Sequence, residues 1–141
     1  LRCQDEALAA RVVWHDRLPP RAAWQVAAKA QVGLSLLHAT PAFVDAMPSK
    51  VYEYLACGLA VLSSPLPRVV ELLGESGAGE VVSSTDATAA ALTRWARDRD
   101  ELARVQAAAA ARGAILRTAA NAYDGMAQRV AELAAITARG H

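Results

Sequence analysis

Two carboxylates, a hydroxyl and an ammonium group lie close together in one short stretch of the chain, at Asp45, Ser49, Lys50 and Glu53. If a helix begins at Pro48, Ser49 and Lys50 lie in its first turn, where free backbone N–H groups and the positive end of the helix dipole favour a bound anion. A lysine at such a position is typical of phosphate binding. A carboxylate one turn later can accept hydrogen bonds from hydroxyl groups. The residue types therefore predict a site for a ligand that carries both phosphate and hydroxyl groups.

A short helix must position these side chains. Pro48 suits its start, because the missing N–H of proline would have no partner there. Gly58 suits its end, where a residue in the left-handed conformation closes a helix. At 100° per residue, Glu53 lies roughly opposite Val51 and Leu55. The apolar face can therefore pack on a sheet while the polar face meets a ligand.

Apolar runs alternate with helical patterns along the rest of the chain. We expect strands at residues 11–15, 32–37, 60–63 and 80–82. We expect helices before residue 11, from Pro20 to about Gln31, between residues 48 and 57, after Pro67, around Trp95, and at residues 100–115 and 121–137. This alternation predicts an α/β fold: a partial doubly wound, Rossmann-like parallel sheet with C-terminal helices.

Ligands of such sheets bind beyond the carboxyl ends of the strands. The segments expected at that edge are residues 15–17, 38–47, 63–68 and 83–86, so the polar stretch described above belongs to it. Four strands would leave one side of the sheet without a neighbour, which indicates that further strands precede residue 1.

The large aromatic side chains are expected to pack inside this fold. Trp14, Trp24 and Trp95 are interpreted as core residues, and Tyr52 and Tyr54 as packing residues. No Ser/His/Asp set or glycine-rich phosphate loop is found.

The composition excludes several other classes of protein. The 141 residues are 54% hydrophobic and 21% charged, which indicates one globular domain. A net charge of +1 argues against nucleic acid or an anionic membrane as the partner. Cys3 and Cys57 lack the spacing of metal ligands, so no metal is expected, and a buried thiol at Cys57 fits a reducing compartment. There is no apolar run of about 18 residues that could span a membrane, and no signal peptide is expected.

The polar stretch resembles the E-x7-E region of retaining GT-B glycosyltransferases, the glycosyltransferase group 1 family. Asp45-x7-Glu53 takes the place of the motif, and PSKVYEYLACGLAVLSS is similar to the family pattern P-S/T-K-x-x-E-Y-x-A-x-G-x-P-V-x-x-S. VGLSLL before it and SGAGEVV after it follow the family's order. The resemblance covers roughly Val12 to Leu133 and corresponds to the latter part of a nucleotide-sugar-binding domain. Several segments agree in order and spacing, which makes it more specific than E-x7-E alone.

The resemblance implies a role for each residue of the motif. Glu53 would accept hydrogen bonds from the ribose hydroxyls of the nucleotide. Asp45, as the catalytic residue, would contact the hydroxyls of the donor sugar. The backbone N–H groups of Ser49, Lys50 and Val51 would face the diphosphate. The donor substrate is a nucleotide-diphosphate sugar, and no metal or separate cofactor is implied.

The chain departs from the family pattern at three positions. Asp45 replaces a glutamate, so its reach is one methylene shorter. Asp16 stands where the family often has glycine, and Ala60 replaces the frequent proline before the strand. The family's arginine and lysine that neutralise the leaving diphosphate are expected before residue 1.

The residues and the resemblance together predict one incomplete donor-binding domain over residues 1–141. Its α/β part would cover about 11–97 and its C-terminal helices 98–141, with the acceptor domain and the first strands missing. The intact protein would transfer a sugar to an acceptor with retention of configuration, whereas this chain alone would be inactive. A cytoplasmic location is expected, and any peripheral membrane association would occur through the missing N-terminal domain.

A second class of function stays open at this point. The chain could be a non-catalytic Rossmann-like module that binds a nucleotide or a partner. The sequence leaves the nucleotide, the sugar and the acceptor open in either case.

Overall fold

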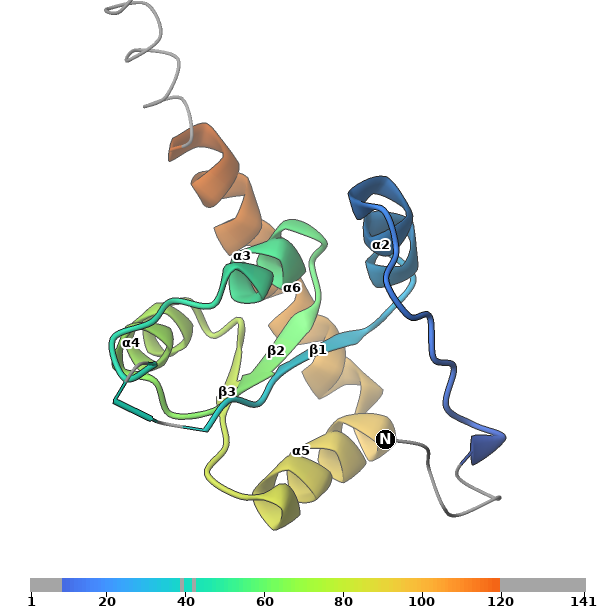
Figure 1. The fold of residues 1–141 in the computed structure, drawn as a ribbon. Helices are drawn as coiled ribbons and strands as arrows, with labels where there is room; N and C mark the ends of the chain where they lie inside the picture. The colour runs from blue at the N-terminus through green and yellow to red at the C-terminus, as the bar shows by residue number, and fades with distance from the viewer. Residues whose placement is uncertain (1–8, 39, 42, 120–141) are drawn as a thin grey trace, which may run out of the picture.

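The computed structural model describes residues 9–119 except residues 39 and 42. Its helices are α2 (Pro20–Ala27), α3 (Ser49–Ala56), α4 (Pro67–Ser76), α5 (Thr85–Arg97) and α6 (Arg99–Ala119), and its strands are β1 (Val32–Ser35), β2 (Ala60–Ser63) and β3 (Gly79–Val81) (Figure 1). The helix expected at residues 121–137, and most of the one before residue 11, lie outside the described residues. No helix in the described part is both long and apolar enough to cross a membrane.

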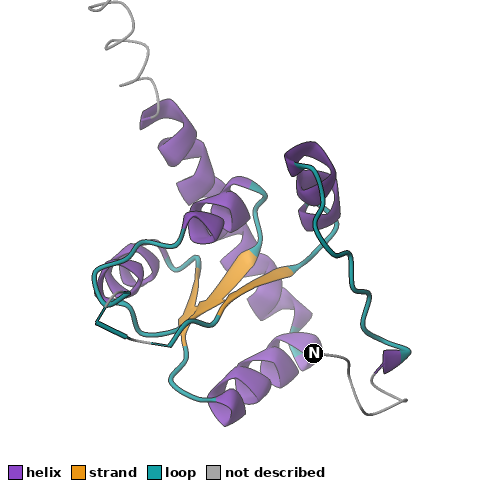
Figure 2. Ribbon diagram, viewed as in Figure 1, coloured by secondary structure: helices purple, strands orange, loops and turns teal. Residues whose placement is uncertain are grey.

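The three strands form one parallel sheet in the order β1-β2-β3 (Figure 2). Gly33 of β1 pairs with Val61, and Leu62 of β2 pairs with Glu80. Every residue of β2 is fully buried, because the strand has a neighbour on each side and helices on both faces. The α/β class and the strand at residues 60–63 are confirmed, and β1 and β3 lie at or beside two of the other predicted strands.

Helices cover both faces of the sheet. On one face, α3 and α4 form a hydrophobic cluster that includes Leu55, Val61 and Val69. On the other face, α5 forms a second cluster that includes Leu62 and Trp95, whose side chain is 1% exposed. Trp95 is therefore the core residue that the sequence predicted.

The long helix α6 joins these two clusters. Its Leu102 belongs to the cluster under α5, and its Ala109 belongs to the cluster under α3 and α4. The helix lies at the amino-terminal ends of the strands, where Gln106 Nε2 donates a hydrogen bond of 3.2 Å to the carbonyl of Gln31, the residue before β1.

α6 lies so close to the end of α3 that it contacts the backbone of that helix. A Cβ atom at Gly113 would overlap the backbone carbonyl of Leu55 at the end of α3. Arg117 Nη1 donates a hydrogen bond of 3.2 Å to the carbonyl of Ala56 in the same turn. The end of α3 is thus held against α6 by main-chain packing as well as by side chains.

The predicted strand at residues 11–15 is wrong. These residues form no strand, and the side chains of Val12, Val13 and Trp14 are 51%, 75% and 79% exposed. A strand needs a hydrogen-bonded neighbour, and none lies beside this segment within the described residues. The four predicted strands are therefore three in the part of the chain that the structure describes.

The helix that follows is shorter than expected and buries none of its residues. It ends at Ala27 rather than near Gln31, and Trp24 is 42% exposed. The prediction of Trp14 and Trp24 as core residues is thus wrong, as is packing for Tyr52, which is 42% exposed. An apolar helix face is buried only where another surface meets it, and α2 has little such surface.

Candidate functional site

The helix α3 forms where the sequence predicts but begins one residue later, at Ser49 instead of Pro48. Pro48 adopts an extended conformation just before it, and Gly58 has a φ of +69° just after it. Glycine adopts this left-handed backbone conformation without steric cost. Val51 and Leu55 are completely buried, whereas Glu53 is exposed. The apolar face therefore packs on the sheet and the polar face points away from it.

The first turn of α3 leaves fewer free donors than the sequence suggested. The N–H of Val51 donates a hydrogen bond of 3.0 Å to the carbonyl of Pro48. The N–H groups of Ser49 and Lys50 make no hydrogen bond to other described residues. Two backbone donors rather than three are thus available to an anion, and the expectation for the Val51 N–H needs this correction.

Lys50 and Glu53 line the same hollow. It lies between α2 and α3, has a volume of about 370 Å³, and is also lined by Pro20, Trp24 and Tyr54. A cation, a carboxylate and two aromatic side chains therefore share one concave surface. Asp45 is exposed in the turn before α3 and does not line this hollow.

Tyr54 forms a fixed wall of that hollow. Its ring occupies the space that a Cβ atom of residue 33 would need, so it can pack on β1 only because residue 33 is glycine. Its hydroxyl donates a hydrogen bond of 3.2 Å to the carbonyl of Leu34. Burial, with a smaller contribution from the carboxylate of Glu53, raises the pKa of Tyr54 above its ordinary value. The tyrosine is thus held on the sheet as a neutral side chain.

The hydroxyl of Tyr54 also covers part of the outer side of β1. The carbonyls of Gln31 and Ser35 accept hydrogen bonds from the N–H groups of Ala60 and Ser64, on the β2 side. Because carbonyl directions alternate along a strand, the carbonyl of Leu34 points away from β2. Tyr54 therefore satisfies a main-chain acceptor at the unpaired side of the sheet.

A second hollow, of about 580 Å³, lies at the carboxyl ends of the strands. It is lined by residues that follow β1, β2 and β3, among them His38, Ser64 and Ser83, and by the first turns of α5. The expectation that segments 38–47, 63–68 and 83–86 meet at this edge is confirmed in part. Segment 15–17 does not line the hollow.

Two polar residues near the carboxyl ends of the strands carried no prediction. Thr88 lines the hollow from α5, and its hydroxyl donates to the carbonyl of Ser84. Ser35 at the end of β1 is completely buried, and its hydroxyl has no partner among the described residues. Ser35 belongs to the VGLSLL segment, but neither residue was assigned a role from the sequence. The only available signal was their position at the ends of predicted elements.

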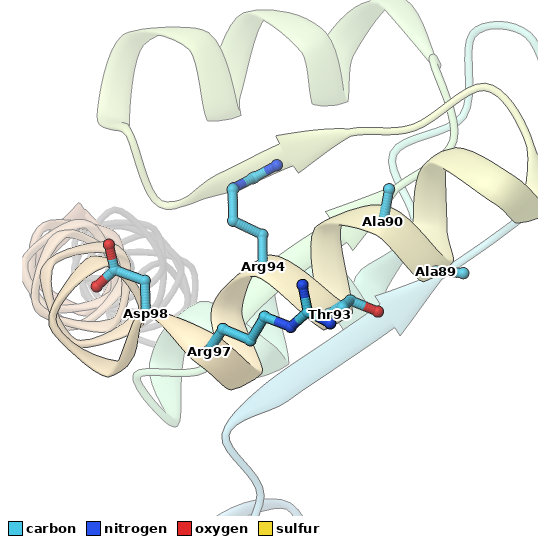
Figure 3. Close-up of a pocket in the computed structure, with 6 residues that line it drawn as sticks. All are labelled: Ala89, Ala90, Thr93, Arg94, Arg97 and Asp98. Atoms are coloured by element: carbon cyan, nitrogen blue, oxygen red, sulfur yellow. The ribbon is translucent and has the colours of Figure 1, made fainter.

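A third hollow, of about 600 Å³, lies on the outer face of α5 (Figure 3). Arg94 extends from it toward β3 and pairs with Glu80, and its Nε donates a 2.9 Å hydrogen bond to Glu101. These carboxylates, Glu80 first, raise the pKa of Arg94 above its ordinary value. Its charge is thus used in a structural ion-pair network.

Comparison with known proteins gives one match. A family model described as glycosyl transferase-like matches residues 4–135. No curated protein and no solved structure matches the chain. Within the described residues, no group of three or more His, Cys, Asp or Glu side chains could hold a metal ion.

Proposed function

Since this chain belongs to the glycosyl transferase-like family, we propose that it is the nucleotide-sugar-binding part of a retaining glycosyltransferase of the GT-B fold. The observation that carries the proposal is the meeting of Lys50 and Glu53 in one hollow beside the start of α3. The parallel sheet with helices on both faces supports it, because such sheets bind nucleotides beyond their carboxyl edge.

Each part of the donor has a partner in this proposal. The diphosphate lies at the start of α3, near the N–H groups of Ser49 and Lys50 and the ammonium group of Lys50. The ribose hydroxyls donate to the carboxylate of Glu53. Asp45, in the turn before α3, contacts the donor sugar. Val51 contributes through its buried side chain, which holds α3 on the sheet.

The proposed reaction is transfer of a sugar from a nucleotide-diphosphate sugar to an acceptor, with retention of configuration. As the bond to the diphosphate breaks, negative charge grows on the leaving group. The positive end of α3 and Lys50 stabilise that charge. Transfer needs the donor and the acceptor to be held together, so we expect this chain alone to bind the donor without transferring its sugar. The free thiol of Cys57 supports a reducing, cytoplasmic compartment.

Replacing Glu53 tests the proposal. Glu53→Gln keeps the shape of the side chain and weakens two charge-assisted hydrogen bonds of about 1.5–3 kcal/mol each. We expect the affinity for the preferred nucleoside diphosphate to fall by about ten-fold or more, at about 1.4 kcal/mol per ten-fold. Folding should hardly change, because the side chain is exposed. Calorimetry measures the affinity, and thermal unfolding measures the stability.

Glu71→Gln is the matched control. Glu71 is exposed on α4 and does not line the hollow. Its replacement removes the same charge, which changes the general attraction for an anion but no specific contact. An equal affinity in the Glu53→Gln and Glu71→Gln chains would contradict the proposed role of Glu53. Absence of any nucleotide binding by the unchanged chain would favour a module that acts through its fold or a protein partner.

A further inference from the structure

Trp24 is a large aromatic residue that the described part of the fold leaves partly exposed. Its side chain is 42% exposed, and the helix that carries it buries none of its residues. The same side chain lines the hollow that contains Lys50 and Glu53. An aromatic surface that contributes little to the core, yet lies in the candidate site, is available to a ligand.

We propose that Trp24 is the surface on which the heterocyclic base of the bound nucleotide stacks. This inference rests on the proposed function and specifies how the same site holds the base. Aromatic side chains stack on the faces of nucleobases, and every base has such a face. The indole of Trp24 offers the largest aromatic surface in the hollow.

The distribution of polarity in the hollow supports this assignment. The side contributed by α3 carries the cation and the carboxylate, and the side contributed by α2 is apolar, with Pro20 and Ala23 beside Trp24. A nucleoside diphosphate has the same division, with its charged groups at one end and its flat base at the other. The volume of about 370 Å³ falls in the range of small-molecule sites.

The two aromatic residues of the hollow have different roles. Tyr54 is fixed by Gly33 and by its hydrogen bond to Leu34, so it shapes the wall. Trp24 has no such fixation, because α2 buries none of its residues. Loss of the Trp24 ring should therefore change binding without changing folding.

Calorimetry on the full chain tests the inference with two probes. The first is whichever of UDP, GDP and ADP binds most tightly, and the second is pyrophosphate, which lacks a base. In Trp24→Ala we expect the affinity for the nucleotide to fall by about five- to a hundred-fold, the range observed for base stacking. The affinity for pyrophosphate should stay the same, and Trp24→Phe should restore most of the nucleotide affinity.

Trp14→Ala is the matched control, because Trp14 is 79% exposed and does not line the hollow. It should bind both probes as the unchanged chain does. If Glu53→Gln weakens nucleotide binding and Trp24→Ala does not, the inference is overturned while the proposed function stands. An equal loss for pyrophosphate in Trp24→Ala overturns it too, since that result means a structural role. A chain that binds no nucleoside diphosphate overturns both.

Discussion

The two ends of the β-strands differ sharply in how they are covered. At the amino-terminal ends, α6 approaches so closely that Gly113 has no room for a Cβ atom against Leu55. At the carboxyl-terminal ends lies an open hollow of about 580 Å³ lined by His38 and several hydroxyl side chains. The difference indicates that packing closes one end of the sheet and leaves the other end open. Changes at the two ends should therefore differ in their effect on the free energy of unfolding.

The largest expected effect comes from the same substitution made at each end. Leu55 is completely buried above the sheet near α6, and Leu36 is 46% exposed in the open hollow. Leu55→Ala should lower the free energy of unfolding by about 2–5 kcal/mol, the cost of a cavity in a core. Leu36→Ala should cost less than about 1 kcal/mol, because little apolar surface returns to water. Urea unfolding measures both, and similar losses would contradict the division between the ends.

A second pair compares glycines inside helices. Alanine normally stabilises a helix relative to glycine by about 1 kcal/mol. Gly74→Ala in α4 should show that gain, since nothing lies within 4 Å of the added atom. Gly113→Ala should instead lower the free energy of unfolding by about 1–3 kcal/mol, because the Cβ atom would overlap the carbonyl of Leu55. A stabilised Gly113→Ala chain would mean that α6 does not close the amino-terminal ends.

The smallest effect concerns Tyr54, which lies on the flank between the two ends. Burial and Glu53 raise its pKa in the folded state above the ordinary value of about 10. The folded state therefore holds the phenolic proton more tightly than the unfolded chain does. The resulting stability is complete below about pH 10 and is lost as the pH rises through the folded-state pKa.

Tyr54→Phe isolates this contribution. The variant loses the hydrogen bond to Leu34, which costs about 0.5–1.5 kcal/mol at neutral pH. It also loses the alkaline part of the pH dependence, so its stability and that of the unchanged chain should converge above about pH 10. Unfolding by urea at several pH values measures the gap. A constant gap across this range would show that Tyr54 keeps an ordinary pKa.

Much of the fold could be predicted where the sequence carries a complete local signal. Residues 60–62 are apolar and lie between Gly58 and Pro65, and they belong to the central strand. Ser84 lies in the polar segment 83–86 that was expected to follow a strand, and its Oγ accepts a 3.1 Å hydrogen bond from the N–H of Ala87 at the start of α5. In both cases the hydrogen-bonding partner is present: neighbouring strands lie on each side of β2, and the N–H of Ala87 bonds to Ser84.

The wrong predictions share one physical cause. The run at residues 11–15 and the apolar face around Trp24 have the composition of buried elements, yet no described element lies against them closely enough to bury them. An apolar pattern indicates that a segment can be buried. It does not indicate whether another element is present to bury it. The structure explains why the family often has glycine where this chain has Asp16. Its φ of +52° is a backbone conformation that glycine favours and aspartate tolerates.

The candidate site was predictable only in part for a related reason. The spacing from Lys50 to Glu53 places both side chains on the accessible side of one helix, and they do line one hollow. Trp24 comes from a different helix, and nothing in its neighbourhood connects it to that spacing. The engagement of the Val51 N–H by Pro48 also depends on the geometry of the first turn, which residue types do not specify.

The position of α6 has a consequence for the time course of protein synthesis. Both hydrophobic clusters include a residue of this helix, Leu102 in one and Ala109 in the other. While the ribosome is still making the earlier strands and helices, neither face of the sheet can be completed. Folding as each segment emerges, which multidomain chains often use, therefore has to wait here for one late helix. The nascent chain exposes both unfinished faces until then, and these are the surfaces on which a chaperone would act.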